Sequence, residues 1–432
     1  MTVKGGVVSM KPGRAFLAAT ALGAANTANA YWPIRRGRGS VLSFVPGQFT
    51  SELPLHAMAW QTAATVAFIR RGCLRSSSGR AGVALAAASW AGLLGLHNEA
   101  KRSRDVLEHA LEEALGPQYR KRMTGPSAGG EVALTRRQVA FPVRGRRRRY
   151  AGVSNLAYAG NGRRNHLDIW RRPGLAPDAR APVLVQVHGG AWTTGSKRGQ
   201  AYPLLEYLAE RGWVCVAINY RLAPKSVWPD QIVDVLQAVG WVRANIAEHG
   251  GNPDFIAITG GSAGGHLSAL AALVAGKPEF QPGFEELDTS VQAAVPFYGI
   301  YDFSAFGEPG WGDAERFLGR VLFRSRLADD RARWEQASPI SHARPDAPPF
   351  FVIHGSNDSL AAVEQARTFV ERLRAESDNP VVFAELPRAQ HAFDIYSSVR
   401  TTHTVRAVER FLDVMHADHL AQRDGLTAAT QL

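Results

Sequence analysis

Beyond residue 150, short runs of apolar and β-branched residues alternate with segments in which apolar residues recur at helical spacing. Eight runs have the length and composition of buried strands: 154–160, 166–170, 182–188, 213–219, 255–259, 291–298, 349–354 and 380–386. Helical patterns occupy 200–211, 229–248, 264–275, 361–376 and 400–417. Apolar strands separated by helices predict a mostly parallel sheet with helices on both faces. The first two strands are expected to form an antiparallel hairpin at one edge.

The first 149 residues show a different pattern. Three weakly hydrophobic stretches of sixteen residues, 15–30, 54–69 and 81–96, are rich in Ala and Gly. Each is shorter than the roughly 20 residues that span a bilayer comfortably. A basic loop joins the second stretch to the third, which predicts a helical hairpin. An amphipathic helix is expected over 97–122 and a basic linker over 136–150.

Three interpretations of this N-terminal region remain open. The helical hairpin favours association with a membrane surface or the cell envelope. A cleaved signal peptide is the second interpretation, because Lys4, Lys11 and Arg14 precede the first stretch and a cleavage-like sequence ends at Ala30. The third is a set of helices packed on the main domain, which would suit a cytoplasmic protein.

The charge distribution limits the range of partners. The formal net charge is +12, yet residues 1–150 contain 23 Lys and Arg against 7 Asp and Glu, whereas the remainder contains 27 against 31. No nucleic-acid-binding motif accompanies the basic residues, so we expect no nucleic-acid partner and a possible membrane-surface contact. The two cysteines lie far apart, and no His or Cys spacing is typical of a metal site, so neither a disulfide scaffold nor a metal is predicted.

Candidate chemistry occurs where predicted strands end, which is where α/β sheets bind ligands. The sequence GGSAG over 260–264 follows the fifth strand and fits G-x-S-x-G, in which glycines let the chain turn sharply beneath an exposed Ser262. Asp358 follows the seventh strand and His391 the eighth. Taken singly, each has an ordinary explanation as a turn, a helix cap or a solvated histidine. Together they match the chain order of an α/β-hydrolase triad.

A second glycine-containing motif, HGGAW over 188–192, follows the third strand. The backbone amides of Gly190 and Ala191, with Gly189 as a further candidate, are expected to form an oxyanion hole together with the amide of Ala263. One such preorganised donor is worth about 3–4 kcal/mol in the transition state. His188 and His266 are expected to have packing roles.

The segment between the sixth and seventh strands, residues 303–346, combines aromatic residues with many arginines. We expect a helical lid or a wall of an acyl pocket, the alternative being an ordinary helical excursion with its own small core. Trp311 and Phe317 in this insert, and Trp192 beside the glycines, are the candidate substrate-binding residues.

With these motifs, residues 150 to about 418 resemble the hormone-sensitive-lipase-like family of α/β-hydrolases. NYRLAP over 219–224 and FYGIYDF over 297–303 are similar to further segments of that family, and the whole chain resembles actinobacterial membrane-associated carboxylesterases. Two departures are visible: HGGA replaces the usual HGGG, and Gly261 stands where the family often has an acidic residue. The form HGG-x-W also resembles arylformamidases.

The resemblance implies an α/β-hydrolase domain over 150–420 containing the insert, an N-terminal extension over 1–149 and a tail over 421–432. It implies a serine carboxylesterase that hydrolyses short- to medium-chain acyl esters, lipid-derived ones among them, with no metal or organic cofactor. A formamidase-type amidase and a catalytically silent hydrolase fold used for binding remain as alternatives. Neither the oligomeric state nor the physiological substrate follows from the sequence.

Overall fold

The computed structural model describes residues 10–124, 136–142, 147–308 and 310–430. Its single sheet has the strand order β1-β2-β4-β3-β5-β6-β7-β8. The strands are β1 (Ala151–Ala157), β2 (His166–Trp170), β3 (Ala181–Val187), β4 (Val214–Ile218), β5 (Gly251–Gly261), β6 (Ala293–Phe297), β7 (Phe350–Gly355) and β8 (Val381–Leu386). β2 is antiparallel to both β1 and β4, and the remaining pairs are parallel. All eight predicted strands and the edge hairpin are confirmed.

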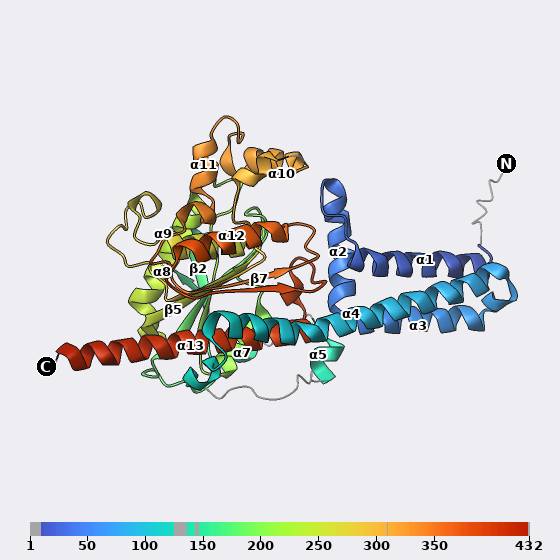
Figure 1. Ribbon diagram of the computed structural model, residues 1–432, viewed down its shortest axis with the longest axis horizontal. Helices are drawn as coiled ribbons and strands as arrows, with labels where there is room; N and C mark the ends of the chain where they lie inside the picture. The colour runs from blue at the N-terminus through green and yellow to red at the C-terminus, as the bar shows by residue number, and fades with distance from the viewer. Residues whose placement is uncertain (1–9, 125–135, 143–146, 309, 431–432) are drawn as a thin grey trace.

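Helices cover both faces of the sheet, as predicted (Figure 1). One face carries α8 (Asp230–Asn245), α9 (Ala263–Val274) and α12 (Val363–Glu376). The other face carries α7 (Tyr202–Glu210) and α13 (Val399–Thr430). α13 continues beyond residue 420, where the sequence suggested a separate tail.

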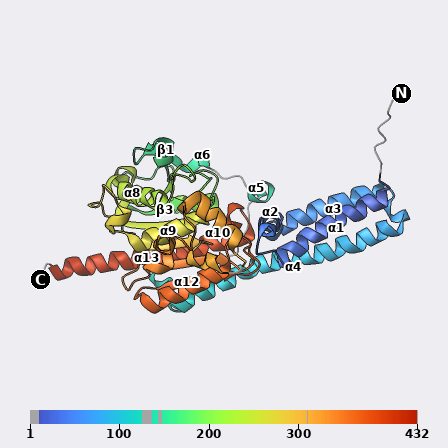
Figure 2. The ribbon, with the colours of Figure 1, turned by 90° about the horizontal axis from the view of Figure 1, so that it is seen from above.

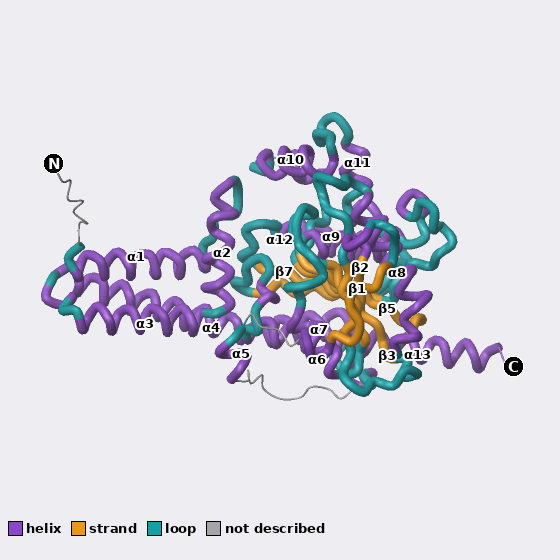
Figure 3. Tube along the Cα trace, turned by 180° about the vertical axis from the view of Figure 1, so that it is seen from behind, coloured by secondary structure: helices purple, strands orange, loops and turns teal. Residues whose placement is uncertain are grey.

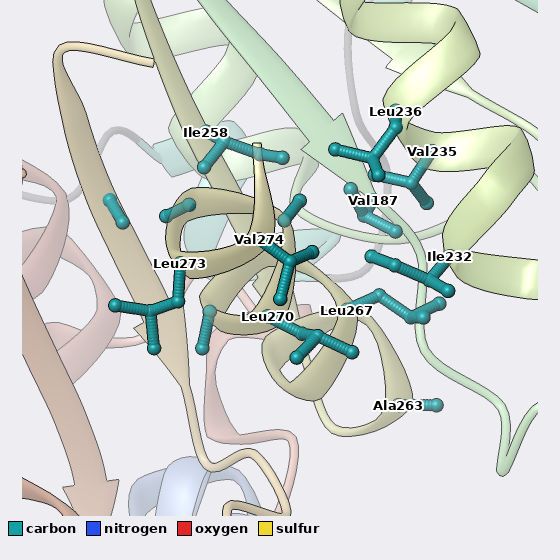
Figure 4. Packing of buried hydrophobic residues seen from close by; sticks show 14 of the residues in the cluster. Val187, Ile232, Val235, Leu236, Ile258, Ala263, Leu267, Leu270, Leu273 and Val274 are labelled. Carbon is teal, nitrogen blue, oxygen red and sulfur yellow. The ribbon is translucent and has the colours of Figure 1, made fainter. Parts of the chain in front are cut away.

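The alternating side chains of β3 show how the sheet is buried on both sides. Val185 and Val187 pack into the cluster beneath α8 and α9, whereas Leu184 packs into the opposite cluster beneath α7 and α13. Figure 4 shows Val187 close to Ile232 of α8 and Leu267 of α9. Burying each such side chain stabilises the fold by about 1.5–3 kcal/mol. This double packing fixes the strand ends that carry the candidate motifs.

The N-terminal region forms a helical bundle that projects from the sheet domain (Figures 1 and 2). The bundle contains α1 (Pro12–Tyr31), α3 (Pro54–Arg70) and the first half of α4 (Ser77–Leu115). α3 and α4 form the predicted helical hairpin. The amphipathic helix expected over 97–122 is the second half of α4, which continues from the third apolar stretch without a break and ends at Leu115.

Besides the end of α1, where Asn357 donates to the carbonyl oxygen of Ala30, α4 and α2 (Arg38–Glu52) contact the sheet domain. The second half of α4 packs through Leu107 and Leu111 into the cluster beneath α13. α2, which the sequence did not predict, crosses the bundle at its sheet-domain end (Figures 1 and 3). The predicted linker is helical over Arg136–Ala140 and Arg147–Tyr150, and its residues 143–146 lie outside the described part.

The predicted insert between β6 and β7 is helical. It contains α10 (Gly312–Leu318) and α11 (Arg331–Gln336), connected through a short helical turn over Gly319–Phe323. In Figure 1 both helices lie above the sheet domain, on the same side as the free end of α2.

Candidate active site

Ser262 lies at the sharp turn between β5 and α9, with a left-handed φ of 59°. A Cβ atom at Gly264 or at Gly260 would collide with the carbonyl oxygen of Val187, so only glycine lets this corner pack against β3. The turn leaves Ser262 half-buried at the N-terminus of α9. A left-handed non-glycine residue here is a strained conformation held by its surroundings.

Asp358 and His391 lie in the loops that follow β7 and β8. The Nδ1 atom of His391 is 2.7 Å from the Oδ2 atom of Asp358, and both side chains are buried. The backbone amides of Leu360 and Ala361 each donate to Oδ1 of Asp358 over 2.8 Å. The Nε2 atom of His354 lies 3.3 Å from Oδ2. The carboxylate is therefore fixed on both oxygens.

The environment keeps Asp358 ionised. Burial alone would raise the pKa of its carboxyl group, but the charge of His391 and hydrogen bonds from His354 and His391 outweigh burial and hold the pKa well below its ordinary value. An ionised Asp358 can hold the His391 ring in one tautomer, with Nδ1 donating.

One pocket of about 430 Å³ brings the predicted residues together. Ser262 and His391 both line it. The three aromatic residues expected to bind substrate line it as well: Trp192, Trp311 and Phe317. Trp192 comes from the loop after β3 and the other two come from the insert.

The HGGAW loop supplies the candidate oxyanion donors. Gly190, Ala191 and Trp192 all have left-handed φ angles, of 125°, 50° and 59°. Within the described residues, no acceptor is recorded for the amides of Gly190, Ala191 and Ala263. Gly189 differs from the expectation, since its amide donates to Oε1 of Gln200 over 2.7 Å and is already engaged.

His266 and His188 pack against aromatic residues near the site, in line with the packing roles expected for them. His266 accepts a hydrogen bond at Nδ1 from Nε1 of Trp192 over 3.0 Å, and its Nε2 is 2.8 Å from the carbonyl oxygen of Ala337. Burial lowers the pKa of His266 to about 3, so the ring is neutral. His188 stacks on Tyr220 with ring centroids 4.3 Å apart, and burial lowers its pKa to about 4.

Sequence reasoning missed the contribution of the N-terminal segment. Arg38 and Val41 at the start of α2 line the pocket, and the Phe44 ring contacts the His391 ring edge-on at 5.9 Å between centroids. The only available signal was apolar residues at helical spacing, in a segment more than two hundred residues from Ser262.

Tyr298 and Asp394 were also missed. The Tyr298 ring centroid lies 4.7 Å from that of His391, and its hydroxyl donates to the half-buried Asp394 carboxylate. A Cβ atom at Gly261 would collide with this hydroxyl. Tyr298 thus occupies the space of a side chain at 261, which explains why the acidic residue common before the serine is absent.

Within the described residues, no group of three or more His, Cys, Asp or Glu side chains is arranged to hold a metal ion. The chemistry available at this site is that of a serine hydroxyl, an imidazole, a carboxylate and backbone amides.

Comparison with known proteins agrees with this arrangement. A family model for BD-FAE matches residues 167–373. The chain is 48% identical over 420 residues to the probable carboxylic ester hydrolase LipM of Mycobacterium tuberculosis, covering 96% of each chain, and 43% identical to esterase LipQ of the same organism over 91% of this chain and 89% of that one. A solved Thermogutta terrifontis esterase with bound butyrate is 27% identical, with a TM-score of 0.51 over 60% of this chain and 93% of its own. The chain therefore belongs to the hormone-sensitive-lipase-like family of carboxylic ester hydrolases, with the α/β-hydrolase fold.

Proposed function

We propose that this protein is a serine carboxylesterase in which Ser262 is the nucleophile, His391 the general base and acid, and Asp358 the residue that orients His391. The observation that carries the proposal is the 2.7 Å contact between Nδ1 of His391 and Asp358, in a pocket that His391 shares with Ser262. The names of the similar mycobacterial proteins, ester hydrolase and esterase, support the reaction class.

In the acylation step, Nε2 of His391 takes the proton from Ser262 as Oγ attacks the ester carbonyl carbon. The tetrahedral intermediate collapses when His391 returns the proton to the leaving alcohol, which departs and leaves an acyl-enzyme. Water then repeats the sequence: His391 removes its proton, the acyl–Oγ bond breaks, and the proton returns to Ser262. Asp358 stays ionised and stabilises the imidazolium in both steps.

The negative charge on the carbonyl oxygen needs donors that are preorganised and free. The amides of Gly190, Ala191 and Ala263 meet that requirement, whereas the amide of Gly189 does not because Gln200 occupies it. The N-terminus of α9 adds a favourable field at the same point. We therefore assign a three-amide oxyanion hole to this enzyme.

Trp192, Trp311 and Phe317 form the wall of the acyl pocket in this proposal. A pocket of about 430 Å³ suits acyl chains of short to medium length. The similar Thermogutta terrifontis esterase was solved with butyrate and with propionate, which supports a short acyl group for this fold.

Hydrolysis of p-nitrophenyl esters across a series of acyl lengths tests the proposal. We expect turnover that peaks at short to medium chains, and a loss of at least about 10⁴-fold in kcat for Ser262→Ala. Ser268→Ala on the same helix is the matched control, because Ser268 bonds only within α9 and lies away from the pocket. If well-folded enzyme hydrolysed matched anilides faster than esters, the amidase alternative would replace this proposal, and no turnover of either would leave a binding protein.

A further inference from the structure

The bundle of α1, α3 and the first half of α4 exposes large apolar side chains: Leu22 is 65% exposed and Trp60 is 73% exposed. Large apolar side chains inside the bundle include Phe16, Leu93 and Leu96. Small hydroxyl residues of the bundle lie inside as well, with Thr27 and Ser89 both buried. A helical bundle in water usually places polar residues on its outer surface and keeps side chains as large as Leu and Trp inside, because burying them is what stabilises it. The outer surface of this bundle is suited to an apolar surrounding.

The interior contacts of the bundle are those of helices packed within lipid. The hydroxyls of Thr27 and Ser89 share a hydrogen bond of 2.9 Å, and Tyr31 donates from its hydroxyl to the Gly92 carbonyl oxygen over 2.8 Å. Gly82 of α4 lies directly against the Phe16 ring, with no room for a Cβ atom. Small residues at the helix contact and hydrogen bonds between helices are the usual means of association where no hydrophobic effect operates.

The uncharged segment of each bundle helix is nearly as long as the hydrocarbon core of a bilayer is thick. No Asp, Glu, Lys or Arg occurs in 15–31, 53–69 or 81–98. Seventeen or eighteen helical residues extend about 26 Å, close to the roughly 30 Å thickness of the hydrocarbon core. Arginines flank the uncharged segments at both ends: Arg14, Arg70 and Arg80 at the far end, and Arg35 and Arg102 at the end beside the sheet domain.

α4 is the one described helix that is long and apolar enough by itself to cross a membrane. α1 and α3 are less apolar, and both pack against it. We therefore consider the three helices as one unit.

α2 lies across the axis of the bundle at its sheet-domain end (Figure 1). Three large apolar residues on it, Val41, Leu42 and Val45, are each more than 60% exposed, while Gln48 and Glu52 are buried against the sheet domain. If the bundle axis follows the membrane normal, a helix perpendicular to it lies in the interfacial plane with its apolar side toward lipid. The start of this helix is a wall of the active-site pocket.

We propose that the bundle spans a bilayer, that α2 lies in the interface, and that the active-site pocket opens there to accept ester substrates from the bilayer itself. The proposal rests on the esterase function above and names its substrate class, a membrane-resident amphiphilic ester. Phe317, 43% exposed on the insert, faces the same pocket and extends the apolar rim opposite α2. The ester carbonyl reaches Ser262 without its acyl chain crossing water.

The test uses full-length enzyme reconstituted in phosphatidylcholine vesicles and two esters with the same leaving group. 4-Methylumbelliferyl acetate is soluble, whereas 4-methylumbelliferyl decanoate, whose acyl group is of medium length, partitions into the bilayer. The variant carries Leu42→Glu and Val45→Glu, two exposed positions that do not line the pocket. We expect decanoate hydrolysis to fall about tenfold or more, because two charges are placed in the interface, with acetate hydrolysis unchanged.

The matched control carries Leu287→Glu and Leu420→Glu, two exposed leucines of the sheet domain, and should hydrolyse both esters like the wild type. Equal losses on both esters, or no loss on the decanoate, would overturn the interfacial role of α2. Wild-type enzyme that hydrolyses the acetate and leaves the decanoate in the vesicles intact would overturn the uptake of substrate from the bilayer. Extraction of wild-type membranes with alkaline carbonate tests the spanning bundle independently of α2: retention supports it, and release would overturn it. If neither ester is hydrolysed by wild type, the esterase proposal fails instead, and carbonate extraction still decides the membrane proposal.

Discussion

The two sides of the candidate active site are held by different parts of the chain. The Ser262 side is supported from within the sheet domain: Gly260 and Gly264 pack on Val187, and Trp192 donates a hydrogen bond to His266. The Asp358–His391 side also contacts the N-terminal residues 30–52. Asn357, next to Asp358 in the chain, donates to the carbonyl oxygen of Ala30 over 2.7 Å.

Further contacts join α2 to the residues on both sides of His391, between β8 and α13. Gln48 of α2 donates to the carbonyl oxygen of Ala392 over 2.6 Å. Glu52, also on α2, forms a fully buried ion pair with Arg400, whose Nη2 donates to the Pro387 carbonyl oxygen over 3.0 Å. The turn that carries Ser262 is held by contacts within the α/β sheet domain. The loop that carries His391 also contacts α2, more than three hundred residues away in sequence.

Among the following predictions, the largest expected effect is on kcat and comes from a change at Asp358, the proposed orienting residue. Asp358→Asn should reduce kcat by about 10³–10⁴-fold, because the neutral amide no longer selects the tautomer of His391 or stabilises its charge. Asp394→Asn is the matched control: this half-buried carboxylate also lies near His391 but accepts from Tyr298, so we expect less than about a tenfold loss. Steady-state ester hydrolysis measures both. Equal losses in the two variants would show that Asp358 is not the orienting residue.

Breaking the buried ion pair tests whether the N-terminal segment supports the histidine side. Glu52→Gln leaves Arg400 charged and unpaired, so the free energy of unfolding should fall by about 3–5 kcal/mol. Chemical denaturation in detergent measures this, together with a drop in kcat. Glu99→Gln, which removes the partner of the largely exposed Arg102, should cost no more than about 1 kcal/mol. If Glu52→Gln lowered the free energy of unfolding no more than Glu99→Gln, the Asp358–His391 side would not depend on α2.

A smaller, pH-dependent effect probes the nucleophile side. The pKa of His266 is about 3 in the folded protein against 6.5 ordinarily, so below pH 6.5 the unfolded chain binds a proton that the folded one does not. The free energy of unfolding should therefore fall by up to about 1.4 kcal/mol per pH unit on acidification toward pH 3 from this residue. His266→Gln keeps both hydrogen bonds and should remove that slope. Chemical denaturation at pH 7, 6 and 5 measures this slope. Ser262→Ala is the control: it alters no group that titrates in this range, so it should keep the wild-type slope.

The sequence could predict every element whose signal is local. The central strands are nearly continuous apolar runs, and the glycines around Ser262 and the residues Asp358 and His391 follow strands. The apolar residues of α2 have helical spacing, but they point outward while Gln48 and Glu52 are buried, so this pattern did not indicate which side packs on the domain. The amphipathic helix expected over 97–122 is the second half of α4, and the change from an apolar to an amphipathic pattern along α4 follows a change in what surrounds this helix.

By itself, the sequence determined the sheet, the order of its motifs and the chemistry they offer, since strand periodicity and glycine geometry act over a few residues. Only the tertiary structure decided which groups surround that chemistry. The amide of Gly189, a candidate oxyanion donor by sequence, donates instead to Gln200, and Tyr298 fills the space beside Gly261. Val41 lines the pocket with Ser262 and His391 although these residues are remote from it in sequence. Such contacts depend on how the domain and bundle pack together, and no local pattern encodes them.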